Sequence, residues 1–189
     1  MLPAVRLPSI SAMATTTSVR DRTTTVSLSA PSTPRLRMES TGSRRTLLDG
    51  GWWPRSNDPV AELPGLVLAI DNLRGPVIRL VLSAAGWDTR PRRLSVAGRV
   101  LRLGYFASQP ISLLTALCAN GDRVDLLVVP PDATAGTALA AMTLAATADN
   151  VVHAHDILLN ASSPTAPVAE DAWEGEGGHL RPIPVMTGH

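Results

Sequence analysis

Alternating hydrophobic and polar positions dominate the middle of the chain, between residues 77 and 129. Residues two apart lie on the same side of an extended chain, so this alternation predicts β-strands with one buried face and one partly solvated face. Gly98 and the pair Asn120-Gly121 separate consecutive runs and predict two hairpins, the second with a type I′ turn. The alternating runs are 77–83, 93–97, 99–106, 111–118 and 122–129, with a shorter one at 35–39.

A helix is expected after Asp58-Pro59, which pairs a favourable N-cap with a favourable first helical residue. Gly75-Pro76 ends this segment. Pro64 falls inside it and is expected to kink or restart the helix. The apolar face has residues three or four apart, namely Val60, Leu63, Val67, Ile70 and Leu73.

A second helix is predicted over the Ala-rich residues 134–148, with Asp132 or Thr134 as its cap. A short final helix is expected around residues 156–160. The core-facing stripe of the Ala-rich helix is expected to be Leu139, Met142 and Ala146.

These elements together predict an α+β fold. Tight hairpins pair strands antiparallel, so we expect a mostly antiparallel sheet of about five or six strands with two or three helices packed on one face. A single domain is expected over residues 34–160. The Ser/Thr-rich residues 1–33 and the Pro-, Gly- and Glu-rich residues 161–189 are predicted to be disordered, because they bury too little apolar surface to offset the entropy of ordering.

Composition changes how the charged residues are interpreted. All 17 cationic residues are Arg, and Gly and Pro are also frequent, a bias that GC-rich codons produce and that indicates a high-GC bacterium. Residues 1–55 hold eight Arg against three acidic residues, whereas residues 56–189 hold nine Arg against thirteen. The folded part is therefore expected to be weakly acidic, which disfavours duplex binding because that normally uses a basic face.

The single cysteine, Cys118, lies inside a predicted strand. One cysteine cannot form an internal disulfide, so we expect a reducing cytoplasm and a buried apolar role for this side chain. Trp87 and Tyr105 are expected in the core or at its rim. No run reaches the roughly eighteen apolar residues of a transmembrane helix, and residues 1–33 lack the apolar stretch and cleavage site of a signal peptide.

The most unusual segment reads Asp49-Gly50-Gly51-Trp52-Trp53-Pro54-Arg55-Ser56. Glycines permit a sharp turn, and consecutive Trp side chains in an extended chain point to opposite sides. One indole is expected to enter the core and the other to line a pocket, with Arg55 available for a carboxylate or phosphate. Alternatively the loop is structural and covers the sheet edge, with Asp49 and Arg55 paired with each other or with backbone. The ligand-binding candidates are Asp49, Trp52, Trp53 and Arg55.

Four segments, DGGWWPRS, DPVAELPGL, RLGYF and VDLLVVPP, resemble an uncharacterised domain family found in actinobacteria. The resemblance extends from Arg35 to Asn150, nearly the whole expected domain. It implies a bacterial origin and the limits of the domain. It implies no activity, cofactor or catalytic residue, because that family has none assigned.

Two other groups of polar residues offer weaker sites. His153 and His155 would face the same way only in an extended chain, and no third ligand is near them in the sequence, so we expect no bound metal. Four Arg at strand positions form either a cationic strip for an anionic ligand or the solvated face of the sheet, where Asp125 would be a cross-strand partner. They are Arg79, Arg99, Arg102 and Arg123.

The familiar local motifs of enzymes are missing: there is no GxxxxGK[ST], GxGxxG, GxSxG, HExxH or CxxC. This favours a non-catalytic domain without a cofactor, which binds a small molecule or a regulatory partner. The alternative is an enzyme that uses Asp49 as base and Arg55 as electrostatic stabiliser. A third hypothesis, binding of single-stranded nucleic acid through the Arg-rich stretch before Ser56 and stacked Trp, is disfavoured by the acidic body.

Overall fold

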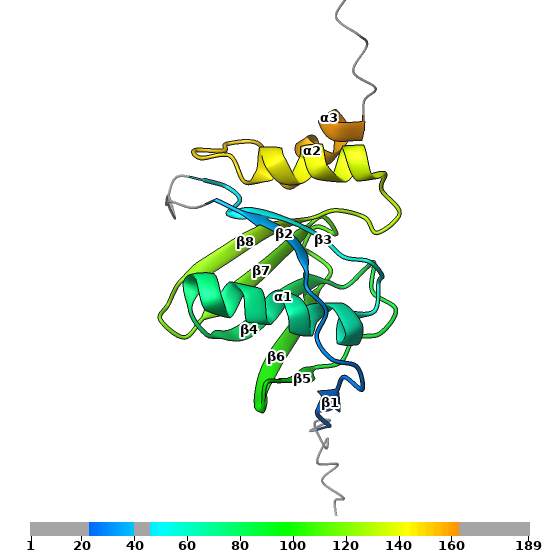
Figure 1. The fold of residues 1–189 in the computed structure, drawn as a ribbon, viewed down its shortest axis with the longest axis vertical. Coiled ribbons are helices and arrows are strands. Elements are labelled where there is room, and N and C mark those ends of the chain that lie inside the picture. Colours follow the sequence, from blue (N-terminus) through cyan, green and yellow to red (C-terminus); the bar gives the residue numbers. More distant parts are fainter. Residues whose placement is uncertain (1–22, 40–45, 163–189) are drawn as a thin grey trace, which may run out of the picture.

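A single mixed sheet organises the protein (Figure 1). The structure, a computed structural model, describes residues 23–39 and 46–162, and within them the sheet has eight strands in the order β1-β5-β6-β4-β7-β8-β3-β2. The strands are β1 (Thr25–Val26), β2 (Arg35–Met38), β3 (Gly50–Trp53), β4 (Val77–Ser83), β5 (Arg93–Val96), β6 (Arg99–Phe106), β7 (Leu113–Cys118) and β8 (Arg123–Val128). The helices are α1 (Pro59–Arg74), α2 (Ala135–Ala145) and α3 (Ala154–Ser162).

The α+β class is confirmed, with more strands than the sequence predicted. Four of the seven neighbouring pairs in the described sheet are antiparallel and three are parallel. The extra strands are the short β1 and β3, which the alternation rule does not detect. The parallel pairs join strands that are not consecutive in the chain, such as β4 and β6, which are separated in sequence by β5.

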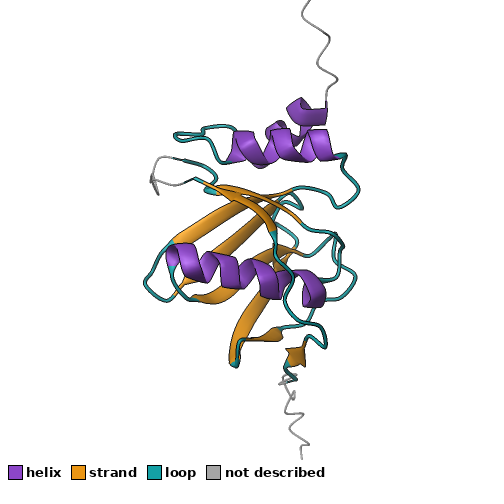
Figure 2. Ribbon diagram, viewed as in Figure 1, coloured by secondary structure: helices purple, strands orange, loops and turns teal. Residues whose placement is uncertain are grey.

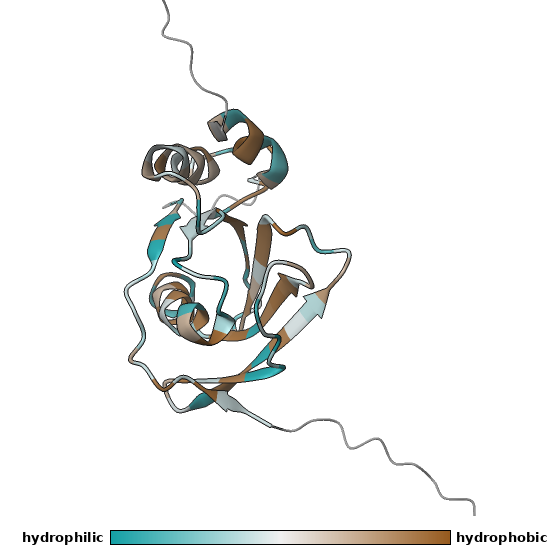
Figure 3. Cartoon of the chain, turned by 90° about the vertical axis from the view of Figure 1, so that its right-hand side faces the viewer, coloured by the Kyte–Doolittle hydropathy of each residue, from teal (hydrophilic) through white to brown (hydrophobic). Residues whose placement is uncertain are grey.

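The sheet curves around α1, which Figure 3 shows nearly end-on. Leu63, Leu66, Val67 and Ile70 of α1 are fully buried in a cluster with Leu, Val and Ala side chains of β4 to β8. Each strand contributes alternate residues to this cluster, Leu80 and Leu82 of β4 for example. The predicted helix face is therefore confirmed except at Leu73, which is exposed in the last turn.

The helices lie on both faces of the sheet, not on one face as predicted (Figure 2). Leu126 of β8 packs into the cluster under α1, whereas the next residue, Leu127, packs into a second cluster with α2 and α3. The strand is buried on both sides, so its apolar residues run consecutively instead of alternating. The second cluster also contains Leu48, Val129 and Ile157.

Local end signals predicted α1 well. The Asp58 carboxylate accepts a hydrogen bond from the Val60 backbone N–H at 2.9 Å, and Gly75 closes the helix with a φ of 96°. The helix runs continuously through Pro64, so it does not restart there.

The buried stripe of α2 differs from the prediction. Thr134 caps the helix, with its hydroxyl accepting from the Thr137 N–H at 3.3 Å. Leu139 is 49% exposed, whereas Met142 is buried as expected. The remaining contact face consists of alanines, which let α2 approach the sheet closely; they are Ala138, Ala141 and Ala145.

Both predicted hairpins form, but the second does not have the predicted type I′ turn, which occurs in the first instead. Ala97 and Gly98 have φ of 48° and 77°, the paired positive values that a type I′ turn requires. At the second hairpin only Gly121 has positive φ, at 90°, and its N–H donates to the Cys118 carbonyl at 3.1 Å. This is a three-residue loop closed by a glycine bulge. Cys118 is buried in β7 as expected.

The domain reaches further toward the N-terminus than predicted. β1 lies inside the segment 1–33 expected to be disordered, and it pairs with β5 through Thr25↔Leu94 and Val26↔Ser95. Residues 1–22 and 163–189, the rest of the two predicted tails, lie outside the described residues. None of the helices in the described part of the chain is long and apolar enough to span a membrane.

Candidate functional site

The Trp-containing segment forms strand β3 rather than the predicted turn. It pairs antiparallel with β2 and parallel with β8. A Cβ atom on Gly50 would collide with the Arg37 carbonyl oxygen, and one on Gly51 would lie 2.8 Å from the Met142 Cα. The two glycines therefore serve close packing of β2 and α2 against β3, as isolated strand glycines often do.

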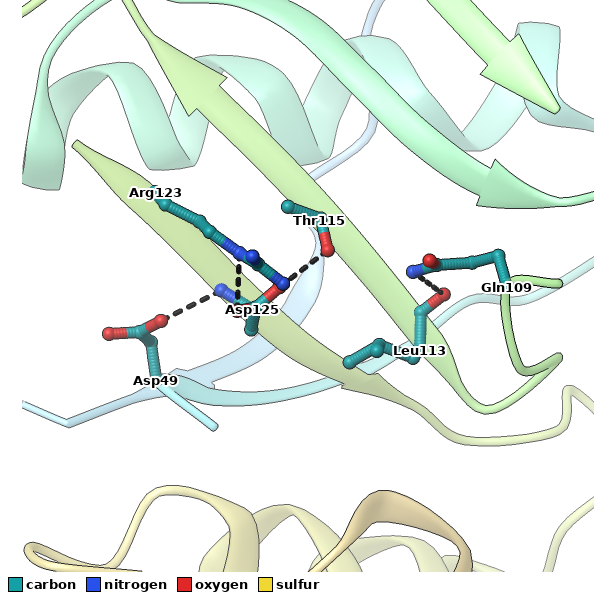
Figure 4. Close-up of polar contacts among 6 residues, drawn as sticks. All are labelled: Asp49, Gln109, Leu113, Thr115, Arg123 and Asp125. Carbon is teal, nitrogen blue, oxygen red and sulfur yellow. Dashed lines mark hydrogen bonds and ion pairs between the residues drawn. The ribbon is translucent and has the colours of Figure 1, made fainter. Parts of the chain in front are cut away.

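Asp49 fixes the start of β3 to β8 (Figure 4). Its backbone N–H donates to the Asp125 carbonyl oxygen, and its carboxylate accepts from the Asp125 N–H, both at 2.7 Å. Burial raises the pKa of Asp49 above its ordinary value, although the hydrogen bond from Asp125 opposes that shift. The carboxylate therefore serves the backbone, as the structural alternative expected.

The Asp125 carboxylate is likewise engaged by neighbours in the sheet. The Arg123 Nε lies 2.8 Å from one carboxylate oxygen, and the Thr115 hydroxyl donates to the other. Thr115 is the cross-strand neighbour of Asp125, whereas Arg123 lies two residues before it on the same strand. The expected cross-strand pairing of Asp125 with arginine is thus a pairing within β8.

The two indoles of β3 point to opposite faces of the sheet, as predicted for an extended chain. Trp52 is 1% exposed and stacks on Trp87, with ring centroids 6.2 Å apart and planes inclined by 19°. Trp53 packs against the cluster beneath α2 and α3. The Arg35 guanidinium covers the Trp53 ring at 3.4 Å from its centroid. Trp52 thus belongs to the core, and Trp53 is enclosed by the protein's own side chains.

Arg55 is exposed beyond the other end of β3, with its Nη1 3.5 Å from the Ser32 hydroxyl. Asp49 and Arg55 therefore flank opposite ends of the strand. Nothing in this arrangement brings the carboxylate and the guanidinium onto one reacting group, which is what the enzyme hypothesis needs. Arg55 also lies close enough to Arg35 to lower its pKa, after burial as the larger cause.

A cavity of about 220 Å³ opens beside this loop, and we call it the Trp87 cavity. It lies where parallel strands end: Pro54 follows β3, Trp87 follows β4, and Pro130 follows β8. β3 runs parallel to β8, and β4 also does, because both β4 and β8 are antiparallel to β7. Sequence reasoning placed Trp87 at the rim of the core, which is confirmed, but it did not detect the cavity because the walls come from distant segments.

His153 and His155 are exposed at the start of α3 and line a different cavity, of about 450 Å³, together with Arg123 and Asp125. Within the described residues no three His, Cys, Asp or Glu side chains are placed to hold a metal ion. The Asp125 carboxylate is already paired, as shown above. This cavity therefore offers hydrogen-bonding groups without a ligand set for a metal.

The four strand arginines do not form one strip. Arg99 donates to the Val77 carbonyl oxygen at 2.9 Å and forms an ion pair with Asp71, and Arg123 is paired with Asp125. Arg79 and Arg102 are register partners in β4 and β6. Two of the four are thus committed to structural ion pairs.

Comparison with known proteins identifies a family for the chain. The model of a family of unknown function, DUF5994, matches residues 35–145. No curated protein and no solved structure matches the chain.

Proposed function

The chain belongs to DUF5994, a family of unknown function, and we propose that it is a non-catalytic domain that binds a small, largely apolar molecule in the Trp87 cavity. The observation that carries this proposal is the cavity itself, lined by the Trp87 indole at the carboxyl ends of three parallel strands. Ligands of open sheets with parallel strands commonly bind at that edge.

The size of the cavity limits the ligand to about one ring. An apolar cavity of roughly 150 Å³ holds a benzene molecule, so about 220 Å³ has room for a ring with a few substituent atoms. The walls are mainly Pro, Ala, Val, Ile and Leu side chains around Trp87. Asn57, Ser112 and Asp132 supply the few polar groups that would orient a ligand.

The Trp-containing segment 49–56 packs against the wall of this cavity. Trp52 stacks on Trp87 and holds its indole in place, and Pro54, two residues later, forms part of the wall. A rigid aromatic wall raises affinity because little side-chain entropy is lost on binding. Asp49 and Trp53 hold β3 against its neighbours, and the Arg55 side chain is exposed.

The setting of this activity is also part of the proposal. The all-Arg cation content supports a high-GC, actinobacterial source. The single Cys118, buried in β7, supports a reducing cytoplasm. A ligand-binding domain there would serve as a sensor or regulatory module.

Thermal melts with a library of small aromatic and heteroaromatic compounds test this function. A ligand raises the melting temperature of the wild type by mass action. Ala85→Leu places a larger side chain at an exposed position on the cavity wall and should abolish the shift. Ala61→Leu makes the same change on the exposed side of α1 and should retain it. Equal shifts in both variants, or no shift with any compound, would contradict the proposal.

A further inference from the structure

A third cavity, of about 490 Å³, lies between β4, β6 and the segment that leads into β5. Its lining includes the side chains of Arg79, Arg90 and Arg92 and contains no carboxylate. We call it the arginine cavity. We infer that it binds the phosphate group of a small molecule, at a site separate from the Trp87 cavity.

The three guanidinium groups are free to bind. In residues 23–39 and 46–162, none of the three side chains has a hydrogen bond or an ion pair with another residue. This contrasts with Arg99 and Arg123, which are held by Asp71 and Asp125. Three cations that share one cavity without a counter-charge repel one another, and an anion between them removes that cost.

The backbone around the cavity positions these side chains. β5 pairs with β6 only as far as Arg93 and Arg102. Among the described residues, the rest of β6 therefore has no strand beside it on the β5 side. One further bond, from the Leu103 N–H to the Arg92 carbonyl oxygen at 2.9 Å, fixes the chain at Arg92. The Arg92 side chain thus starts from an anchored backbone and remains free at its guanidinium.

Gly104 lets the Phe106 ring and the Arg79 side chain pack closely over the backbone of β6. A Cβ atom there would lie 2.8 Å from the Phe106 ring and 3.6 Å from the Arg79 Nη2. The Arg79 guanidinium thus lies directly over a residue without a side chain.

Tyr105 provides a second, independent sign of a polar ligand. It is one of the residues that line the cavity, and its hydroxyl is buried without a hydrogen-bond partner among the described residues. Burial raises the pKa of this phenol to about 12, and the nearby Arg90 opposes that shift. The hydroxyl therefore keeps its proton at neutral pH and is an unused donor beside an unpaired guanidinium.

The number of charges favours phosphate over carboxylate. One guanidinium fork satisfies the two oxygens of a carboxylate, which would leave the other two arginines uncompensated. A phosphate group carries up to two negative charges and offers three terminal oxygens, which match several guanidinium donors at once. The chemical class is therefore a phosphorylated small molecule.

Titration calorimetry with inorganic pyrophosphate, at fixed ionic strength, tests this inference on the full chain. The wild type should bind saturably with one site, and acetate should show no binding. Arg92→Gln and Arg79→Gln should each raise Kd about tenfold or more, as loss of a charge-assisted hydrogen bond does. The control is Arg37→Gln, which removes one positive charge from an exposed position on β2 and should change Kd less than about twofold.

Several outcomes would overturn the inference. They are absence of saturable pyrophosphate binding, acetate binding of equal strength, and an equal loss of affinity in the Arg37 variant. Binding of a single-stranded oligonucleotide without binding of pyrophosphate would also overturn it. Ala85 and Trp87 do not line the arginine cavity, so Ala85→Leu should leave the pyrophosphate affinity unchanged. The experiments therefore test the arginine cavity and the Trp87 cavity independently.

Discussion

The Trp52 and Trp87 indoles are stacked, with centroids 6.2 Å apart, and this contact joins the core to the candidate ligand cavity. Trp52 is supplied by β3 and Trp87 by the loop after β4, so two segments far apart in the sequence meet at one wall. One indole is buried completely, and the other faces the cavity. The stability of the core and the shape of the cavity are therefore coupled through this pair.

Trp52→Ala should be the most destabilising change in the β3 loop. Removing a fully buried Trp leaves a large void and typically lowers the free energy of unfolding by about 3–5 kcal/mol. Arg55→Ala should change it by less than about 0.5 kcal/mol because that side chain is exposed, and Trp53→Ala should lie between the two. Urea unfolding of the three variants measures this order, and similar losses for Trp52 and Arg55 would contradict the structure.

Gly51→Ala should weaken the docking of α2 on β3. The added methyl would lie 2.8 Å from the Met142 Cα, which is backbone and cannot move aside cheaply; overpacking of this kind costs about 1–3 kcal/mol. Gly136→Ala, in α2 itself, meets no atom within 4 Å and should be neutral or stabilising by up to about 1 kcal/mol. Thermal melts that rank the two variants the other way would show that β3 and α2 are packed differently.

Local sequence signals were sufficient to predict part of the fold. Asp58-Pro59 and Gly75 act on their own helix ends, so α1 could be delimited from the sequence alone. Strand β3 could not, because Gly50-Gly51 lowers strand propensity and the strand is stabilised by β2 and β8. Leu139 was misplaced for a similar reason: the sheet selects the alanine face of α2, where small side chains permit close approach.

Only part of the candidate site could be predicted from the sequence. The opposite orientation of Trp52 and Trp53 follows from strand geometry and could be predicted. The role of Trp87 could not, since it depends on tertiary contact between loops that follow different strands. The Asp49 carboxylate was a candidate ligand group, and the register of β3 against β8 assigns it to the Asp125 backbone.

Asp49→Asn should remove a destabilising charge at neutral pH. The pKa of Asp49 is raised in the folded protein above the unfolded value of about 3.9. A carboxyl with a raised folded pKa contributes stability that is fully present below the unfolded pKa and is lost as pH rises through the folded pKa. The asparagine amide oxygen can still accept the Asp125 N–H bond and does not ionise.

The melting temperature of the Asp49→Asn variant relative to wild type should therefore rise between about pH 4 and pH 7. At pH 7 the variant should be at least as stable as the wild type. Melts of both proteins in matched buffers measure the difference. A difference that stays constant, or that falls as pH rises, would show that the carboxylate is stabilised by its surroundings.

Tyr105→Phe should leave the ligand-free protein as stable as the wild type or more stable. The lost hydroxyl is buried and has no partner among the described residues, so its removal sacrifices no hydrogen bond. Thr115→Val is the matched control, because the Thr115 hydroxyl donates to Asp125. That change should cost about 1–3 kcal/mol. Destabilisation of equal size in both variants, measured by urea unfolding, would mean that the Tyr105 hydroxyl is bonded in solution.

The most direct test of the proposed function is the indole N–H signal of Trp87 in ¹H–¹⁵N NMR spectra during titration with hits from the aromatic library. The signal is assigned by its disappearance in Trp87→Phe. We expect a saturable shift of the Trp87 signal, larger than that of Trp53, which does not line the cavity. A compound that binds and shifts the Trp53 signal while leaving Trp87 unchanged would contradict ligand binding in the Trp87 cavity.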